Sequence, residues 1–413
     1  MLSRIKKLGP GLLFAGAAIG VSHLVQSTRA GADFGFGLVW ALLLVNLFKY
    51  PFFRYGPQYA MATGESLIDG YYRLGKVFLA LYFLLTFATM FTIQTAVTIV
   101  TASLTSYVIY EFETVSFVGY TLTSVQIWTL IILLICIAIL VLGRYKFLDR
   151  LMKLIVLTLT LSTILSVFAS GFNSENPLSI RQIFPEQSQW LFLIAFMGWM
   201  PAPLDISIWH SVWSLEKKKD DNLVDFKSSI FDFNIGYITT ILLGLGFLTL
   251  GALVFYGSGE VLQTSAAGFS SQLIIMYTNS LGDWAYAIIG IAAVTTMFST
   301  TLTTFDASPR VMSRTTALLS NFKFKETYRL WLGVLFAGTL SIFFFLSANL
   351  GDLVQIATVL SFLTAPFYAI ANYKLINAEH VPKAYRPKRI INILSWLGIV
   401  FLVGFSVWFV TIL

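Results

Sequence analysis

The segment Phe196-Met-Gly-Trp-Met-Pro-Ala-Pro-Leu-Asp205 lies in the middle of a long apolar stretch, residues 189–214. Each of its two prolines removes a backbone N–H donor, so a helix cannot run unbroken through this point. The apolar segment 11–33 is interrupted in a similar way by Gly16-Ala-Ala-Ile-Gly-Val-Ser-His23. We therefore expect two membrane-crossing helices that are broken near mid-membrane and leave backbone groups unpaired.

The composition indicates that water is not the main solvent of this chain. Of its 413 residues, 57% are hydrophobic and 11% are charged, less than half the charged fraction of an average soluble domain. The formal net charge of +7 comes from Lys and Arg in short segments between apolar stretches, which argues against a nucleic-acid surface. The single Cys136 excludes an internal disulfide and makes a thiolate metal site implausible. We expect one integral membrane unit over residues 1–413, without a catalytic domain or a cofactor.

Eleven apolar segments are long enough to cross a bilayer, which takes about 20 residues. They are centred in residues 11–33, 36–60, 77–109, 124–143, 150–171, 189–214, 229–257, 284–312, 328–347, 352–375 and 390–411. No small-residue cleavage site ends the first segment, so we expect a retained helix rather than a signal peptide. This predicts a first five-helix half over 1–171, a second over 188–377 and an additional helix over 388–413.

The distribution of basic residues predicts the orientation. Lys and Arg gather in alternate connections, whereas the intervening connections contain a single basic residue, Arg181. Because basic loops stay in the cytoplasm, we expect a cytoplasmic N-terminus and an outside C-terminus in a bacterial inner membrane. The two halves are then inverted, and their broken helices hold corresponding places. This arrangement is typical of transporters that bind substrate at the bilayer midplane.

Several motifs along the whole chain resemble those of the NRAMP divalent-metal transporters. They are Gly9-Pro10-Gly11, Ala30-Gly31-Ala32-Asp33-Phe34-Gly35, Leu38-Val39-Trp40, Asn46-Leu47, Thr63-Gly64, Met200-Pro201, Ser299-Thr300-Thr301-Leu302-Thr303 and Leu363-Thr364-Ala365-Pro366-Phe367. The resemblance implies an all-α, LeuT-like fold of five plus five inverted helices with an eleventh added, in which helices one and six are broken.

The chain departs from this family at the metal site. The family's Asp-Pro-Gly-Asn motif in helix one falls on Gly20-Val21-Ser22-His23, so none of its Asp and Asn metal ligands is present. The family's helix-six His, used in proton handling, falls on Ala202, and no acid lies between Asp69 and Glu111 in helix three. Hard divalent cations need oxygen ligands, preferably anionic ones. We therefore expect the fold to carry over and the metal chemistry to be lost.

The substrate site is expected where the two breaks meet. Its candidate residues are Gly20, Val21, Ser22, His23, Met200, Pro201, Ala202 and Pro203. Half-helix N-termini carry about half a positive charge, and no acid lies beside the first break, so the pocket should favour an anion or a polar neutral molecule.

The coupling ion is expected at helix eight. By similarity with LeuT-like transporters, the hydroxyls of Ser299, Thr300 and Thr303, together with the carbonyl of Gly20, are candidate sodium ligands. Four charges predicted inside the membrane are further candidates, because such charges are costly: Arg29, Lys49, Asp205 and Asp306. Structural alternatives are an Arg29 that is interfacial or pairs with Asp33, an Asp306 pairing with Arg310, and a Lys49 that neutralises Asp205.

The sequence thus predicts an NRAMP-related secondary transporter that couples sodium entry to uptake of a small anion. Bicarbonate fits, and so do acetate, nitrate or a small zwitterion. One alternative is a manganese- or magnesium-type divalent cation transporter with an atypical site of His23, Met200 and Asp205. A second is a non-transporting sensor or scaffold. The bilayer is the expected environment, and the oligomeric state stays open.

Overall fold

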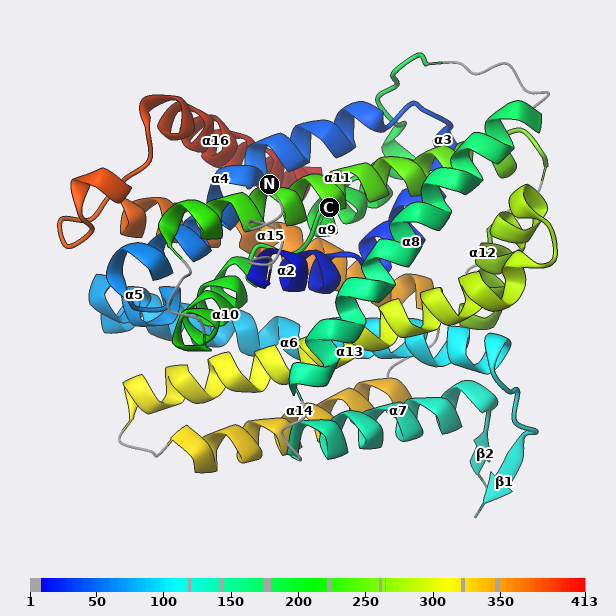
Figure 1. Ribbon diagram of the computed structural model, residues 1–413, viewed down its shortest axis with the longest axis horizontal. Coiled ribbons are helices and arrows are strands. Elements are labelled where there is room, and N and C mark those ends of the chain that lie inside the picture. The colour runs from blue at the N-terminus through cyan, green and yellow to red at the C-terminus, as the bar shows by residue number, and fades with distance from the viewer. Residues whose placement is uncertain are drawn as a thin grey trace.

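The computed structural model describes residues 9–117, 120–141, 145–173, 180–220, 225–259, 262–263, 265–320, 324–345 and 350–412. These residues form helices, apart from loops and one short antiparallel hairpin of β1 (Val115–Phe117) and β2 (Tyr120–Leu122), in which Ser116 lies opposite Thr121. In Figure 1 most of the helices run roughly along one direction. The hairpin lies at one end of this bundle and helix α5 (Leu67–Leu74) lies at the other.

A helix or a pair of half-helices covers each of the apolar segments. The unbroken crossings are α4 (Val39–Thr63), α6 (Lys76–Val108), α7 (Ser124–Val141), α8 (Tyr145–Asn173), α11 (Phe226–Val254), α13 (Ala285–Leu319), α14 (Phe324–Phe345), α15 (Leu350–Ile376) and α16 (Arg389–Ile412). The broken crossings are α2 (Pro10–Ala18) with the π-helix η1 (Ser22–Ser27) and α3 (Thr28–Phe34), and α9 (Trp190–Trp199) with α10 (Ile206–Asp220). Both expected breaks are confirmed.

Length and hydropathy alone identify fewer crossings than this. Among the described residues, seven helices are long and apolar enough to cross a membrane, and an eighth span results if α2 and Ser22–Phe34 count as one crossing bent by 51°. Helix α4 and the α9–α10 pair lie outside that set, and so does α8, which contributes only the shorter apolar stretch Leu157–Gly171. The first carries Lys49 and Arg54 in its interior, and the second is divided by its prolines.

The connections contain structure that periodicity did not predict. Besides the hairpin, they hold α5, α12 (Ala266–Leu281) and the 3-10 turns η2 (Gln187–Gln189) and η3 (Lys383–Tyr385). Helix α5 begins with a capping box in which Ser66 and Asp69 each satisfy the other's backbone amide. Helix α12 lies near the hairpin end of the bundle, opposite α5 (Figure 1).

The packing of the helices is reciprocal. The first crossing packs along α11, the seventh crossing, and α10 of the sixth packs along α4, the second. Helix α6 packs on α7 and α15, while α13 packs on α14 and α8. Each contact made from one half thus has a counterpart made from the other, as two inverted five-helix halves require. The residue limits of the halves stay a prediction.

Helix α11 holds the beginning of α2 in place. The Asp232 carboxylate accepts hydrogen bonds from the amides of Gly9, at 3.1 Å, and Gly11, at 2.7 Å. A carboxylate suits this position because a helix N-terminus is positively polarised. A Cβ on Gly11 would lie 2.1 Å from the Asp232 carbonyl oxygen, so only glycine permits this approach. The first half-helix is therefore fixed at its first turn, which positions the break that follows it.

Candidate functional site

The break in the first crossing is short. Helix α2 ends at Ala18, and the π-helix begins at Ser22 after only three residues. The Gly20 carbonyl accepts from the amides of His23 and Leu24, at 3.1 and 3.0 Å, so it already belongs to the second half-helix. π-Helical turns are rare and occur often at functional sites. Before Gly20, the Ala18 carbonyl accepts from the Gly20 amide and the Ser22 hydroxyl, whereas the carbonyls of Gly16 and Ile19 accept from another helix.

The break in the sixth crossing is longer. Residues 200–205 connect α9 to α10 without regular helix. Trp199, the last residue of α9, donates from Nε1 to Ser361 Oγ at 2.7 Å, which ties this end to α15. A Cβ on Gly198 would lie 2.1 Å from the Thr358 carbonyl oxygen, so α9 and α15 are in close contact here.

A small cavity of about 30 Å³ lies where the two breaks meet. This volume holds roughly two water molecules. Its lining is uncharged: Ala17, Ala18, Gly20, Val21, Ser22, Ile93, Val97, Trp199, Pro203, Ile206, Trp209, Thr300 and Thr304. Four of the eight expected substrate residues, Gly20, Val21, Ser22 and Pro203, are in this lining.

The other four expected substrate residues lie outside the lining. His23 is fully buried, and its Nε2 lies 3.0 Å from the Thr240 carbonyl oxygen of α11. Because a carbonyl only accepts, Nε2 carries the proton of this hydrogen bond, and Nδ1 lies 2.8 Å from the Ser22 hydroxyl. His23 and Met200 both pack toward Gly244 of the same helix. Pro201 and Ala202 offer their carbonyl oxygens, to Ser22 and to Lys49 respectively.

Oxygen atoms gather around Thr300, one of the expected sodium ligands. Its Oγ1 lies 3.2 Å from the carbonyl oxygen of Gly16, 3.3 Å from that of Ile19 and 3.2 Å from that of Thr296. Ser299, the preceding residue of α13, is also buried, and its hydroxyl has no hydrogen-bond partner among the described residues. The structure thus brings α13 and the end of α2 together.

Two of the expected sodium ligands take other roles in this arrangement. The Thr303 hydroxyl donates to the Ser299 carbonyl of its own helix. The Gly20 carbonyl is used in its own half-helix, and Gly20 instead provides room: a Cβ there would lie 2.9 Å from Thr300 Cγ2. The carbonyls that reach Thr300 from the first crossing are those of Gly16 and Ile19.

Two of the charged candidates have structural partners. The Arg310 guanidinium donates twice to Asp306 Oδ2 and once to Oδ1, at 2.8–3.1 Å, and Tyr328 donates to Oδ1 at 2.7 Å. The alternative of an Asp306–Arg310 pair is therefore what the structure shows. Arg29 lies over the ring of Phe192, 5.5 Å from its centroid, which is a cation–π contact.

The two remaining charged candidates lie at the break of the sixth crossing. The Lys49 side chain is fully buried, and Nζ donates to the carbonyl oxygens of Met197 and Gly198, at 2.9 and 2.7 Å. Asp205 is 5% exposed, and its Oδ1 has no hydrogen-bond partner among the described residues.

Trp209 is a site residue that sequence reasoning missed. It lines the central cavity and is 3% exposed, and no described acceptor meets its indole N–H. Its position three residues after Ile206, the first residue of α10, was the available signal, since residues three apart share a helix face. This spacing points to the cavity only because α10 begins at Ile206, which the sequence does not show.

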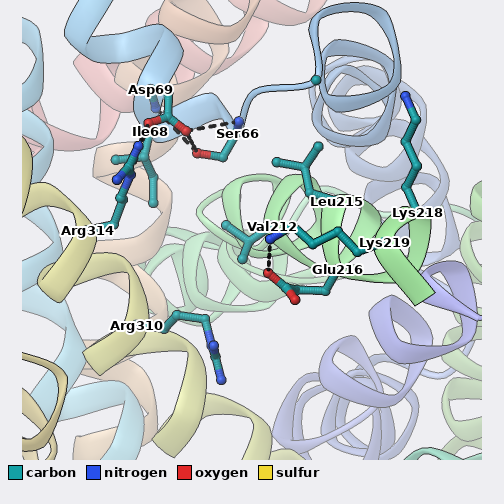
Figure 2. A pocket seen from close by; sticks show the side chains of 11 residues that line it. Ser66, Ile68, Asp69, Val212, Leu215, Glu216, Lys218, Lys219, Arg310 and Arg314 are labelled. Atoms are coloured by element: carbon teal, nitrogen blue, oxygen red, sulfur yellow. Dashed lines mark hydrogen bonds and ion pairs between the residues drawn. The ribbon is translucent and has the colours of Figure 1, made fainter. Parts of the chain in front are cut away.

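A larger cavity of about 670 Å³ opens at the face predicted to be cytoplasmic. Figure 2 shows Arg314 pointing toward Asp69, and Lys219 toward Glu216, with which they form ion pairs. Helix α10 contributes Trp209 to the lining of the central cavity. To the lining of the larger cavity it contributes Val212, Leu215, Glu216, Lys218 and Lys219. The same helix thus connects the two cavities.

The acidic and sulfur side chains do not assemble a metal centre in the described part of the chain. No group of three or more His, Cys, Asp or Glu residues is close enough there to hold a metal ion. The oxygen cluster at Thr300 consists of carbonyls and hydroxyls without a carboxylate. Such a cluster suits a monovalent hard cation better than a divalent one.

Comparison with known proteins agrees with this architecture. The family model described as "Natural resistance-associated macrophage protein-like" (Nramp) matches residues 11–411. An uncharacterized protein of Pasteurella multocida (strain Pm70) is 36% identical over 420 residues, covering 99% of this chain and 92% of that protein.

Solved structures share the fold at low sequence identity. A mutant of the Eremococcus coleocola manganese transporter superposes with a TM-score of 0.71 at 13% identity, covering 96% of this chain and 84% of that one. A nucleobase-cation-symport-1 family transporter in a closed conformation gives a TM-score of 0.57 at 14% identity, covering 97% and 92%. The expected LeuT-like fold is confirmed, and with the match along the family model it shows that this chain, a multi-pass membrane transport protein, belongs to the natural resistance-associated macrophage protein-like family.

Proposed function

We propose that this protein is a secondary transporter that couples sodium entry to the uptake of a small anion such as bicarbonate, bound where the two broken helices meet. The proposal has two parts, the coupling ion and the sign of the substrate. The oxygen cluster around Thr300 carries the first part, and the lining of the central cavity supports the second.

The oxygen cluster has the composition that a sodium site needs. The carbonyls of Gly16 and Ile19 are at the C-terminal end of α2, which is the negatively polarised end of a helix. In transporters with broken helices, such ends and unwound carbonyls coordinate the coupling cation. Thr300 adds a neutral hydroxyl oxygen. We propose that the buried Ser299 hydroxyl, which has no described partner to give up, joins it when an ion binds.

The central cavity offers hydrogen-bond donors and no negative charge. An indole N–H donates and cannot accept, so the partner missing from Trp209 is an acceptor. The second half-helices begin at the cavity with Val21 and Ser22 and with Ile206, so the positively polarised ends of both half-helices lie there. The amides of Ile206 and Ser207 already donate to the carbonyls of Pro203 and Leu204, so these ends act through their dipoles. A small anion satisfies a donor such as the Trp209 indole N–H, and the positive ends of two half-helices favour its charge.

The divalent-cation alternative receives less support from the site. His23 and Met200 lie outside the cavity lining, and the His23 ring already has a partner at each nitrogen. The manganese transporter with a similar fold is only 13% identical to this chain, which supports the shared fold alone.

Uptake by the purified protein in proteoliposomes tests the proposal. Labelled bicarbonate, acetate, nitrate and Mn²⁺ are compared with an inward gradient of sodium or of potassium. We expect one of the anions to enter faster with sodium, and we expect Ser299→Ala with Thr300→Val to remove that stimulation. Thr315→Val, which removes a buried hydroxyl of α13 far from the break, is the control. Sodium-independent Mn²⁺ uptake at micromolar concentration would exclude the proposal.

A further inference from the structure

Lys49 provides a positive charge at a place where broken-helix transporters bind a mobile ion. It belongs to α4, its side chain is fully buried, and its ammonium reaches the break of the sixth crossing. Nζ donates to Met197 O at 2.9 Å, to Gly198 O at 2.7 Å and, more weakly, to Ala202 O at 3.5 Å. All three N–H groups of an ammonium therefore have a carbonyl partner.

These carbonyls are the ones that a helix end leaves unpaired. Met197 and Gly198 are in the last turn of α9, and the last four carbonyls of a helix have no intrahelical donor. They also form the negative end of the helix dipole. Carbonyls at such half-helix ends are ligands for cations in transporters of this architecture.

The charge of Lys49 has no direct counter-ion. Among the described residues, no carboxylate oxygen lies within 4.0 Å of Nζ in an ion pair. A buried charge of this kind is costly. The α9 carbonyls compensate it in the way that they would compensate a bound metal or sodium ion.

The two breaks therefore differ in the cation they accommodate. At the end of α2, the carbonyls of Gly16 and Ile19 face the neutral hydroxyl of Thr300. At the end of α9, the carbonyls face the ammonium of Lys49. Only the first of these two positions is open to a mobile cation.

We propose that Lys49 is a tethered cation: its ammonium occupies the cation position at the end of α9, excludes a divalent ion from it, and keeps a positive charge beside the substrate cavity throughout transport. The part of this inference that concerns the anion rests on the proposed function. It makes Lys49 a specificity-determining residue, although the side chain is outside the cavity lining.

The main test compares Lys49→Met, whose unbranched side chain is one atom shorter and uncharged, with Lys49→Arg, which keeps the charge. Mn²⁺ binding to the purified protein is measured by titration calorimetry, and bicarbonate uptake is measured in proteoliposomes. We expect Lys49→Met to bind Mn²⁺ at least tenfold more tightly than the unchanged protein and to lose at least 90% of its bicarbonate uptake. Lys49→Arg should continue to exclude Mn²⁺.

A second test covers the case in which Lys49→Met does not fold. Lys49→Ala removes three carbons and the nitrogen, which are the atoms of n-propylammonium. We expect n-propylammonium to raise the melting temperature of Lys49→Ala, and 1-propanol, of similar size but uncharged, to have no such effect. Equal stabilisation by both compounds would show that Lys49 only fills space, and would overturn the inference.

The outcomes separate this inference from the proposed function. If the unchanged protein takes up bicarbonate with sodium, and Lys49→Met does the same without binding Mn²⁺, the function stands and the tethered cation is refuted. If the unchanged protein takes up no anion but Lys49→Met gains Mn²⁺ binding, the tethered cation stands and the anion proposal fails.

Discussion

Replacing Trp209 by Phe should change stability and substrate binding in opposite directions. Trp209 and Trp199 line the same cavity, and each is 3% exposed. They differ in their indole N–H groups, because that of Trp199 donates to Ser361 and that of Trp209 has no described partner. Trp199→Phe is therefore a matched control that loses the same volume.

The expected magnitudes follow from the cost of an unsatisfied donor. A buried polar group without a partner costs about 1–3 kcal/mol, and a satisfied hydrogen bond contributes about 1 kcal/mol. Without substrate, Trp209→Phe should therefore be about 2–4 kcal/mol more stable than Trp199→Phe, since the cavity that each substitution creates is similar. A hydrogen bond to a charged group contributes about 1.5–3 kcal/mol, so Trp209→Phe should weaken bicarbonate binding about 10- to 150-fold.

Thermal unfolding in detergent with a thiol-reactive fluorophore measures the stability difference, because the only thiol, that of Cys136, is fully buried in the folded protein. Titration of the same preparations with bicarbonate gives the dissociation constants. The reasoning is refuted if Trp209→Phe is destabilised as much as Trp199→Phe and binds bicarbonate as tightly as the unchanged protein.

Three further predictions follow from the contacts around the site and the connections. Gly20→Ala should reduce sodium-stimulated uptake, because its Cβ would lie 2.9 Å from Thr300 Cγ2. Adding Thr300→Ser, which removes that methyl group, should restore the stimulation. Full stimulation in Gly20→Ala alone would contradict this role of Gly20. Hydrogen bonds from Arg73 hold the pKa of Glu65 below its usual 4.5, so this pair stabilises the protein above that pH and the contribution is lost as the pH falls toward the lowered value. Glu65→Gln should make the melting temperature fall less steeply in that acidic range. An unchanged dependence of melting temperature on pH would show that the Glu65–Arg73 pair does not contribute to stability. A reporter fused after Lys219 should be cytoplasmic and one fused at the C-terminus should be outside; the opposite labelling would reverse the predicted topology.

The sequence alone predicted the eleven crossings, the two breaks and their approximate limits. Apolar length and the backbone effects of Pro201 and Pro203 are local properties, so they can be read without knowing the packing. The same holds for the Asp306–Arg310 pair, because residues four apart on a helix are neighbours wherever that helix lies. The connections were less predictable, since α5 and α12 are short and depend on capping and contacts rather than on long periodicity.

Which polar groups of the site have partners depends on helix packing and could not be predicted from the sequence. His23 follows directly after the first break, yet it turns toward Thr240 of α11, 217 residues away in sequence. Lys49 meets carbonyls 148 and 149 residues away, and Trp209 faces a cavity to which α2, η1, α6, α9 and α13 also contribute. A buried donor or acceptor is satisfied by whatever group packing brings within about 3 Å of it. That distance depends on how the helices pack, because a sequence states which groups need partners without stating which groups will be near them.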